Sequence, residues 1–166
     1  MTRKRFVIFL AGAAVLALTA VAVAGCGGSG ASAPTTANGQ PATVGVENSG
    51  LGNILVDSQG RTLYLFQKDS GTTSECTGAC ASNWPPLEPK ASPTVGSGAN
   101  ASLLGTTTRS DGARQVTYSG HPLYLYRGDQ KPGDTTGQGL VDFGAAWYAL
   151  SPAGDQITGQ ASSAGY

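Results

Sequence analysis

The sequence has few of the residues from which metal, haem and nucleic-acid sites are usually built. One histidine, His121, and one methionine, Met1, occur in 166 residues, and charged residues make up only 12%. A histidine-rich zinc or copper site is therefore not available. Histidine–methionine ligation of haem is excluded if the N-terminal segment carrying Met1 is removed. We expect neither a cofactor nor a bound metal.

Acidic residues are absent from the first part of the chain, where the first one is Glu47. Three of the ten basic residues, Arg3, Lys4 and Arg5, stand at the N-terminus. The rest of the chain therefore has seven basic and ten acidic residues. Because affinity for nucleic acid depends largely on neutralising phosphates, this acidic balance predicts no nucleic-acid partner.

Residues 1–25 have the anatomy of a signal peptide. Arg3-Lys4-Arg5 forms a basic start, and the stretch from Phe6 to Ala24 is almost wholly apolar. Val23-Ala24-Gly25-Cys26 resembles the lipobox of bacterial lipoprotein signals. That resemblance implies cleavage before Cys26, a diacylglycerol on its sulfur, palmitate-type acylation and anchoring at the extracytoplasmic face of the cell membrane. An uncleaved helical anchor is the alternative, since the apolar run is long enough to cross a membrane.

Three cysteines are an odd number for an exported protein. Lipidation of Cys26 leaves Cys76 and Cys80, which we expect to form a local disulfide in an oxidising compartment. Gly78 between them can take the positive φ that so sharp a turn needs. A redox pair is the alternative, although the spacing is not that of the Cys-x-x-Cys motif.

The remaining sequence divides into three parts. Residues 26–43 form a linker of small and polar residues, 44–160 a β-rich domain, and 161–166 a tail. Runs of β-forming residues joined by turn residues predict an all-β domain, a small barrel or sandwich of β-hairpins. The predicted hairpins join Asn53–Val56 to Thr62–Phe66, Gln115–Tyr118 to Leu123–Tyr126, and Trp147–Leu150 to Gln156–Thr158.

One segment of the domain occurs twice. Residues 57–69 read DSQGRTLYLFQKD and residues 117–129 read TYSGHPLYLYRGD, which match at five positions after a shift of sixty. We therefore expect two pseudo-repeats in one core. Side chains alternate along a strand, so Leu63 and Leu65 share one face while Tyr64 and Phe66 share the other. Both faces are apolar, which predicts burial on both sides, or a binding surface on one.

Each repeat contains Tyr-x4-Asp, namely Tyr64 with Asp69 and Tyr124 with Asp129. Five residues of strand would separate a tyrosine from its aspartate by about 16 Å, so the two should not bond within one strand. The aspartates are expected to begin turns by accepting backbone N–H groups. Together with Trp147, these four residues are the candidate ligand-facing side chains, and packing in the core is the alternative.

Two weaker patterns concern other polar residues. His121 lies in a predicted hairpin turn, where we expect it to be exposed. Asp129, Asp134 and Asp142 flank a glycine-rich loop, which could hold calcium or provide paired carboxylates for hydrolysis. A solvated loop is the simpler interpretation, and no nucleophile-elbow motif is present.

The chain resembles a family of predicted secreted bacterial lipoproteins with a repeated Tyr-x4-Asp motif. The resemblance covers nearly all of residues 44–155 and is carried by these segments: Gly60-Arg61-Thr62-Leu63-Tyr64, Cys76-Thr77-Gly78-Ala79-Cys80-Ala81, Trp84-Pro85-Pro86-Leu87, Arg109 to Gly112, Gln115, Gly120-His121-Pro122-Leu123-Tyr124, Pro132-Gly133-Asp134, Gly137-Gln138-Gly139 and Trp147-Tyr148. It implies export and the repeat architecture, and no biochemical activity.

These observations lead to one expected function and two alternatives. We expect a non-enzymatic module, anchored to the membrane by lipid, that binds a ligand or a protein of the cell envelope. The first alternative is a redox or electron-transfer accessory that uses Cys76, Cys80 and the aromatic strands. The second, with the least support, is a hydrolase.

Overall fold

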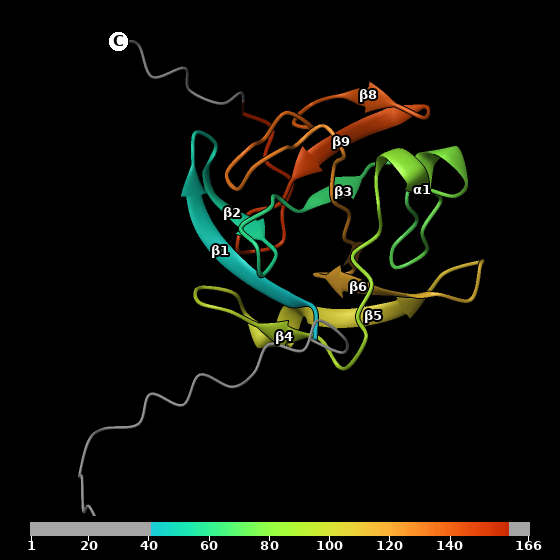
Figure 1. Ribbon diagram of the computed structural model, residues 1–166, viewed down its shortest axis with the longest axis horizontal. Coiled ribbons are helices and arrows are strands. Elements are labelled where there is room, and N and C mark those ends of the chain that lie inside the picture. The colour runs from blue at the N-terminus through green and yellow to red at the C-terminus, as the bar shows by residue number, and fades with distance from the viewer. Residues whose placement is uncertain (1–40, 160–166) are drawn as a thin grey trace, which may run out of the picture. The chain divides into compact units, whose positions relative to one another are not determined.

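The computed structural model describes residues 41–159. This part of the chain contains nine short strands, one α-helix and one 3-10 helix, joined by turns and loops (Figure 1). The predicted signal peptide, Cys26, most of the linker and residues 160–166 lie outside the described residues. No helix within residues 41–159 is long and apolar enough to cross a membrane.

The strands form three sheets of three strands each, in the orders β2-β1-β4, β3-β9-β8 and β5-β6-β7. All neighbours are antiparallel except β1 and β4. The strands are β1 (Thr43–Ser49), β2 (Gly52–Val56), β3 (Tyr64–Phe66), β4 (Thr94–Val95), β5 (Leu104–Thr108), β6 (Arg114–Tyr118), β7 (His121–Pro122), β8 (Val141–Asp142) and β9 (Ala145–Ala149). A 3-10 helix, η1 (Ala101–Leu103), precedes β5. Figure 1 shows β3 between the β8–β9 hairpin and strands β5 and β6.

The all-β class is confirmed, but the arrangement of the hairpins is only partly as predicted. The three sheets of the described region do not close into a barrel. The Asp57 turn forms, with its carboxylate accepting the N–H groups of Gln59 and Arg61. The strands beyond that turn then separate: a single bridge joins Val56 to Thr62, while β3 pairs with β9.

The other two predicted hairpins are also short. β6 turns back through Ser119-Gly120 and pairs with β7 over two residues. The hairpin after β9 is closed by one bridge, between Leu150 and Gln156. The second arms pair instead with segments distant in sequence, as β3 does with β9 and Tyr124 does with Tyr64.

The repeat strands are buried on both sides, as their alternation predicts. Leu63, Leu65 and Leu123 belong to one apolar cluster of the core. Tyr64, Phe66 and Tyr124 belong to a second cluster, which also contains both tryptophans, Trp84 and Trp147. The core is therefore two apolar layers separated by the repeat strands.

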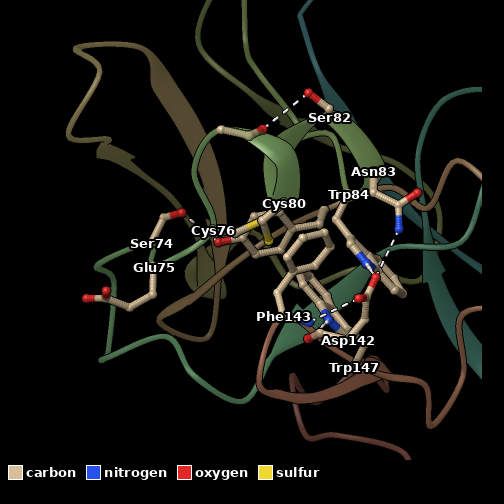
Figure 2. The surroundings of a disulfide bond; sticks show 12 residues. Ser74, Glu75, Cys76, Cys80, Ser82, Asn83, Trp84, Asp142, Phe143 and Trp147 are labelled. Atoms are coloured by element: carbon tan, nitrogen blue, oxygen red, sulfur yellow. Dashed lines mark hydrogen bonds between the residues drawn. A yellow bond between two sulfur atoms is a disulfide. The ribbon is translucent and has the colours of Figure 1, made fainter.

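The disulfide between Cys76 and Cys80 is present, and Cys80 is the second residue of the α-helix α1 (Ala79–Asn83) (Figure 2). The Cα atoms of the cysteines are 5.2 Å apart, and Gly78 has the expected positive φ of 56°. The N–H of Trp84 donates to the carbonyl of Cys80 at 2.7 Å. The bridge and the helix together place Trp84 in the core. The helix was not predicted, since five residues are too few to show a helical period.

Candidate ligand-binding site

The two motif tyrosines lie directly opposite each other. The N–H of Tyr64 donates to the carbonyl of Tyr124 at 2.9 Å, and the N–H of Tyr124 donates to the carbonyl of Tyr64 at 3.0 Å. Such an exchange of both hydrogen bonds is the pattern of an antiparallel pair. The two repeats therefore meet across a local twofold axis between these residues.

Each tyrosine hydroxyl donates to the aspartate of the other repeat. The Tyr64 hydroxyl bonds Asp129 Oδ2 at 2.7 Å, and the Tyr124 hydroxyl bonds Asp69 Oδ2 at 2.8 Å. The prediction that tyrosine and aspartate do not pair within one strand is consistent with this geometry. Sequence reasoning did not identify the partner in the other repeat, because the shift of sixty residues shows that the repeats are alike but not how they pair.

The second carboxylate oxygen of each aspartate organises the following loop, as predicted for turn-forming residues. Asp69 Oδ1 accepts the N–H of Glu75 at 2.8 Å, while Asp129 Oδ1 accepts the N–H and the hydroxyl of Thr136 at 2.9 and 2.6 Å. Each aspartate thus fixes its own loop and holds the other repeat.

A buried arginine extends one of the two pairs into a chain of polar groups. Arg109 Nη1 donates to Ser74 Oγ at 2.8 Å, and Ser74 Oγ lies 2.8 Å from the Tyr124 hydroxyl, which donates to Asp69. Burial raises the pKa of Asp69 from 3.8 to about 6, although the Glu75 N–H and the Tyr124 hydroxyl lower it. In the sequence, Arg109 stood out only as part of the family resemblance.

Because of Asp69, we expect the folded protein to gain stability as the pH falls from 7 towards 4. The folded-state pKa of about 6 lies above the ordinary 3.8, so the folded state binds the proton more tightly. The resulting stabilisation is complete below about pH 4 and is lost as the pH rises through 6. Since Asp69 is partly exposed, we expect a change of about 1 kcal/mol, measured as the difference in unfolding free energy between the wild type and Asp69→Asn.

The matched control for this pH effect is Asp155→Asn at an exposed aspartate. Denaturant unfolding of all three proteins across the pH range gives the comparison. Curves of wild type and Asp69→Asn that run parallel from pH 7 to 4 would contradict the prediction.

Two pockets flank the paired repeats, and each is formed by both of them. The arginine pocket has a volume of about 460 Å³ and is lined mainly by Arg61, Leu125, Tyr126, Arg127, Asp129 and Gln130. The histidine pocket has a volume of about 320 Å³ and is lined by Leu65, Phe66, Gln67, Asp69, His121 and Gln156. After the shift of sixty residues, five positions of one pocket correspond to five of the other. The pockets are therefore pseudo-equivalent and differ in charge.

The arginine pocket has a cationic character. Arg61 forms an ion pair with Asp57 at 2.6 Å. The guanidinium of Arg127 has no hydrogen bond or ion pair to any other residue among 41–159, and Arg127 is exposed. Asp129 is already engaged by Tyr64 and Thr136. The group free to bind a ligand is thus the guanidinium, which suits carboxylate or phosphate oxygens.

The candidate ligand-facing residues divide into two groups. Tyr64, Tyr124 and Trp147 are completely buried, so they fill the core in this structure and line no cleft. Asp69 and Asp129 each line one of the two pockets. Arg61 and Arg127 were not identified as site residues from the sequence, because an arginine in a loop carries no pattern of its own.

The other polar candidates are separated in the structure. His121, predicted to be exposed, is half-buried and lines the histidine pocket. Asp134 accepts two backbone N–H groups of its own loop, and Asp142 accepts hydrogen bonds from Asn83 and Trp84. Among residues 41–159 no three histidine, cysteine or acidic side chains are grouped so that they could hold a metal ion.

Comparison with known proteins identified one family. The sequence profile of a family described as a secreted repeat of unknown function matches residues 45–88 and 105–151, one match for each repeat. These ranges cover more than half of the chain. No curated protein and no solved structure matched significantly.

Proposed function

The chain belongs to this family of secreted repeats of unknown function, and we propose that it is an extracytoplasmic binding module, anchored by lipid on Cys26, that takes an anionic ligand in the arginine pocket. The family points to a location outside the cytoplasm. The lipid anchor on Cys26 and the anionic ligand are our proposals and go beyond what membership of the family implies.

The observation that carries the ligand proposal is the free guanidinium of Arg127 in a pocket built from both repeats. Concave sites with an apolar wall and a few polar groups are the usual form of small-molecule sites. Here Leu125 and Tyr126 supply the wall, while Arg127 supplies the charge. A carboxylate or phosphate could accept two parallel hydrogen bonds from the guanidinium.

We expect anions to bind at this pocket and binding to weaken at least tenfold in Arg127→Gln, which removes the charge and keeps a polar side chain. Inorganic phosphate, acetate and benzoate are the probes, and backbone amide NMR shifts locate the site. Arg114→Gln is the matched control, because Arg114 is an exposed arginine on β6 that lines a different hollow. Equal affinity in Arg127→Gln and wild type, or shifts confined to other surfaces, would reject the site.

Thiol–disulfide exchange at Cys76 and Cys80 has less support as a function. Cys76 is completely buried and Cys80 is 5% exposed, so a thiolate in solution cannot approach the bond without local opening. Slow reduction by dithiothreitol under native conditions would agree with a structural bridge. Rapid reduction without unfolding would favour the redox alternative.

We expect Cys26→Ala to abolish lipid labelling and leave the precursor uncleaved. The cysteine sulfur is the only atom to which the diacylglycerol could be attached in the lipobox-like segment, and processing depends on that lipid. Metabolic labelling with a palmitate analogue and detergent partitioning are the measurements. The control is Cys76→Ala, which should still be labelled. Unchanged labelling and membrane retention in Cys26→Ala would count against the anchor.

A further inference from the structure

Six aromatic rings form one continuous cluster through the centre of the domain. Four of them stack in the order Phe66, Trp147, Trp84, Tyr126, with successive centroids 4.0, 3.9 and 4.2 Å apart. Tyr64 contacts Trp84 edge-on at 5.5 Å, and Tyr124 contacts Trp147 edge-on at 5.2 Å. All are buried except Tyr126, which is half-buried and lines the arginine pocket. The cluster thus connects the core to the surface.

Three of the oxidisable rings donate their ionisable proton to a carboxylate. Tyr64 donates to Asp129, Tyr124 donates to Asp69, and the indole N–H of Trp84 donates to Asp142 Oδ2 at 3.2 Å. The contacts of Trp84 and Asp142 are visible in Figure 2. A phenol or indole that loses an electron becomes strongly acidic, so its oxidation is favoured where a base already holds the proton.

Another buried tyrosine shows that this arrangement is not a general consequence of burial. Tyr118 is as completely buried as Tyr64, but its hydroxyl donates to the carbonyl of Pro152, which is not a base for this purpose. Tyr118 also belongs to the other core cluster, which contains none of the six rings. Among the tyrosines and tryptophans of residues 41–159, hydrogen bonds to a carboxylate are made by rings of this cluster.

We infer that this aromatic cluster is a site of one-electron, proton-coupled oxidation, in which Tyr64 and Tyr124 are the terminal electron donors and the stacked tryptophans carry the electron towards Tyr126. The co-reactant is an anionic one-electron oxidant, because the arginines of the pocket that Tyr126 lines favour negative charge. This inference rests on the arginine pocket of the proposed function, and the two are tested separately, anion binding by NMR and oxidation by radical yield.

The step balances in electrons and protons. The oxidant gains one electron, which leaves Tyr64 through Trp84 and Tyr126, and the phenolic O–H bond of Tyr64 breaks. Its proton passes to Asp129 Oδ2, so the products are the reduced oxidant, a neutral tyrosyl radical and a protonated carboxyl. The corresponding step at Tyr124 uses Trp147 and Asp69.

Burial favours the coupled step over simple electron loss. Burial and the neighbouring carboxylate raise the pKa of the Tyr64 phenol far above its usual range, and burial also raises that of Tyr124. Both phenols are therefore protonated before oxidation. Because an unpaired charge in the core is costly, a neutral radical beside a neutral carboxyl is the favoured product.

The test uses the full chain with an anionic oxidant, a photogenerated ruthenium(III) complex of sulfonated phenanthroline ligands, followed by freeze-trapping and electron paramagnetic resonance. In wild type we expect a long-lived tyrosyl radical whose hyperfine spectrum contains an exchangeable proton from a hydrogen-bond donor. In Tyr64→Phe/Tyr124→Phe its lifetime should fall at least tenfold. Tyr118→Phe is the matched control and should behave as wild type.

The double variant Asp69→Asn/Asp129→Asn keeps a hydrogen-bond acceptor at each site but removes the base that takes the proton. It tests the inference separately if the double phenylalanine variant does not fold. Its radical yield should fall at least tenfold, while near-ultraviolet circular dichroism confirms that the tryptophan stack is intact. An unchanged radical in the double phenylalanine variant, or an unchanged yield in the double asparagine variant, would overturn the inference.

Discussion

Replacing Trp84 by alanine is expected to lower the unfolding free energy by about 3–5 kcal/mol. The side chain is completely buried and stacks between the rings of Trp147 and Tyr126. Its removal leaves a cavity in the core and takes one hydrogen bond from Asp142. Denaturant unfolding monitored by far-ultraviolet circular dichroism measures the loss.

Trp84→Phe separates packing from the indole hydrogen bond. Phenylalanine keeps one aromatic ring in the stack but cannot donate to Asp142, so we expect a smaller loss, about 1–2 kcal/mol. The ring planes of Trp84 and Trp147 are 4° apart, and either variant should abolish any exciton couplet between the two indoles in the far-ultraviolet circular dichroism spectrum. Equal stability of Trp84→Ala and wild type would show that the stack contributes nothing.

Arg109→Met is expected to lower the unfolding free energy by about 3 kcal/mol or more. The substitution removes a buried guanidinium and leaves several buried acceptors without their hydrogen-bond donor. Nη1 donates to Ser74 and to the side-chain oxygen of Gln115, and Nη2 donates to the Cys76 carbonyl at 2.6 Å. Methionine fills a similar volume and bonds none of them. The released loop should also let dithiothreitol reduce the disulfide faster.

The matched control is Arg114→Met, since Arg114 is an exposed residue of β6 whose side chain hydrogen-bonds only Thr106 among residues 41–159. We expect its effect to stay within about 0.5 kcal/mol. Urea midpoints of both variants and the reduction rates measure the difference. Similar losses for the two arginines would contradict the assigned role of Arg109.

The fold could be predicted where local pattern and burial agree. The alternation of Leu63, Tyr64, Leu65 and Phe66 indicated two buried faces, and both are found. The partners of those strands could not be predicted, because the pairing of β3 with β9 joins residues more than eighty positions apart. Nothing in a three-residue strand specifies which of several apolar edges it will join.

The candidate site shows the same limit. The motif residues were identified, but their bonding pattern required knowing that the repeats meet antiparallel at Tyr64 and Tyr124. Arg127 became a candidate only because the fold brings it and Arg61 into the lining of one pocket. A spacing rule applies within an element, whereas these contacts arise between elements.

The reciprocal tyrosine–aspartate bonds have the form of an isologous interface. The tyrosine of each repeat donates to the aspartate of the other repeat, so the two halves make the same contact in both directions. In separate molecules that form describes a homodimer with twofold symmetry. Duplication and fusion of a gene encoding a single self-associating repeat would produce this arrangement. The two halves could afterwards diverge, so that one pocket acquired two arginines while the other acquired histidine and glutamine.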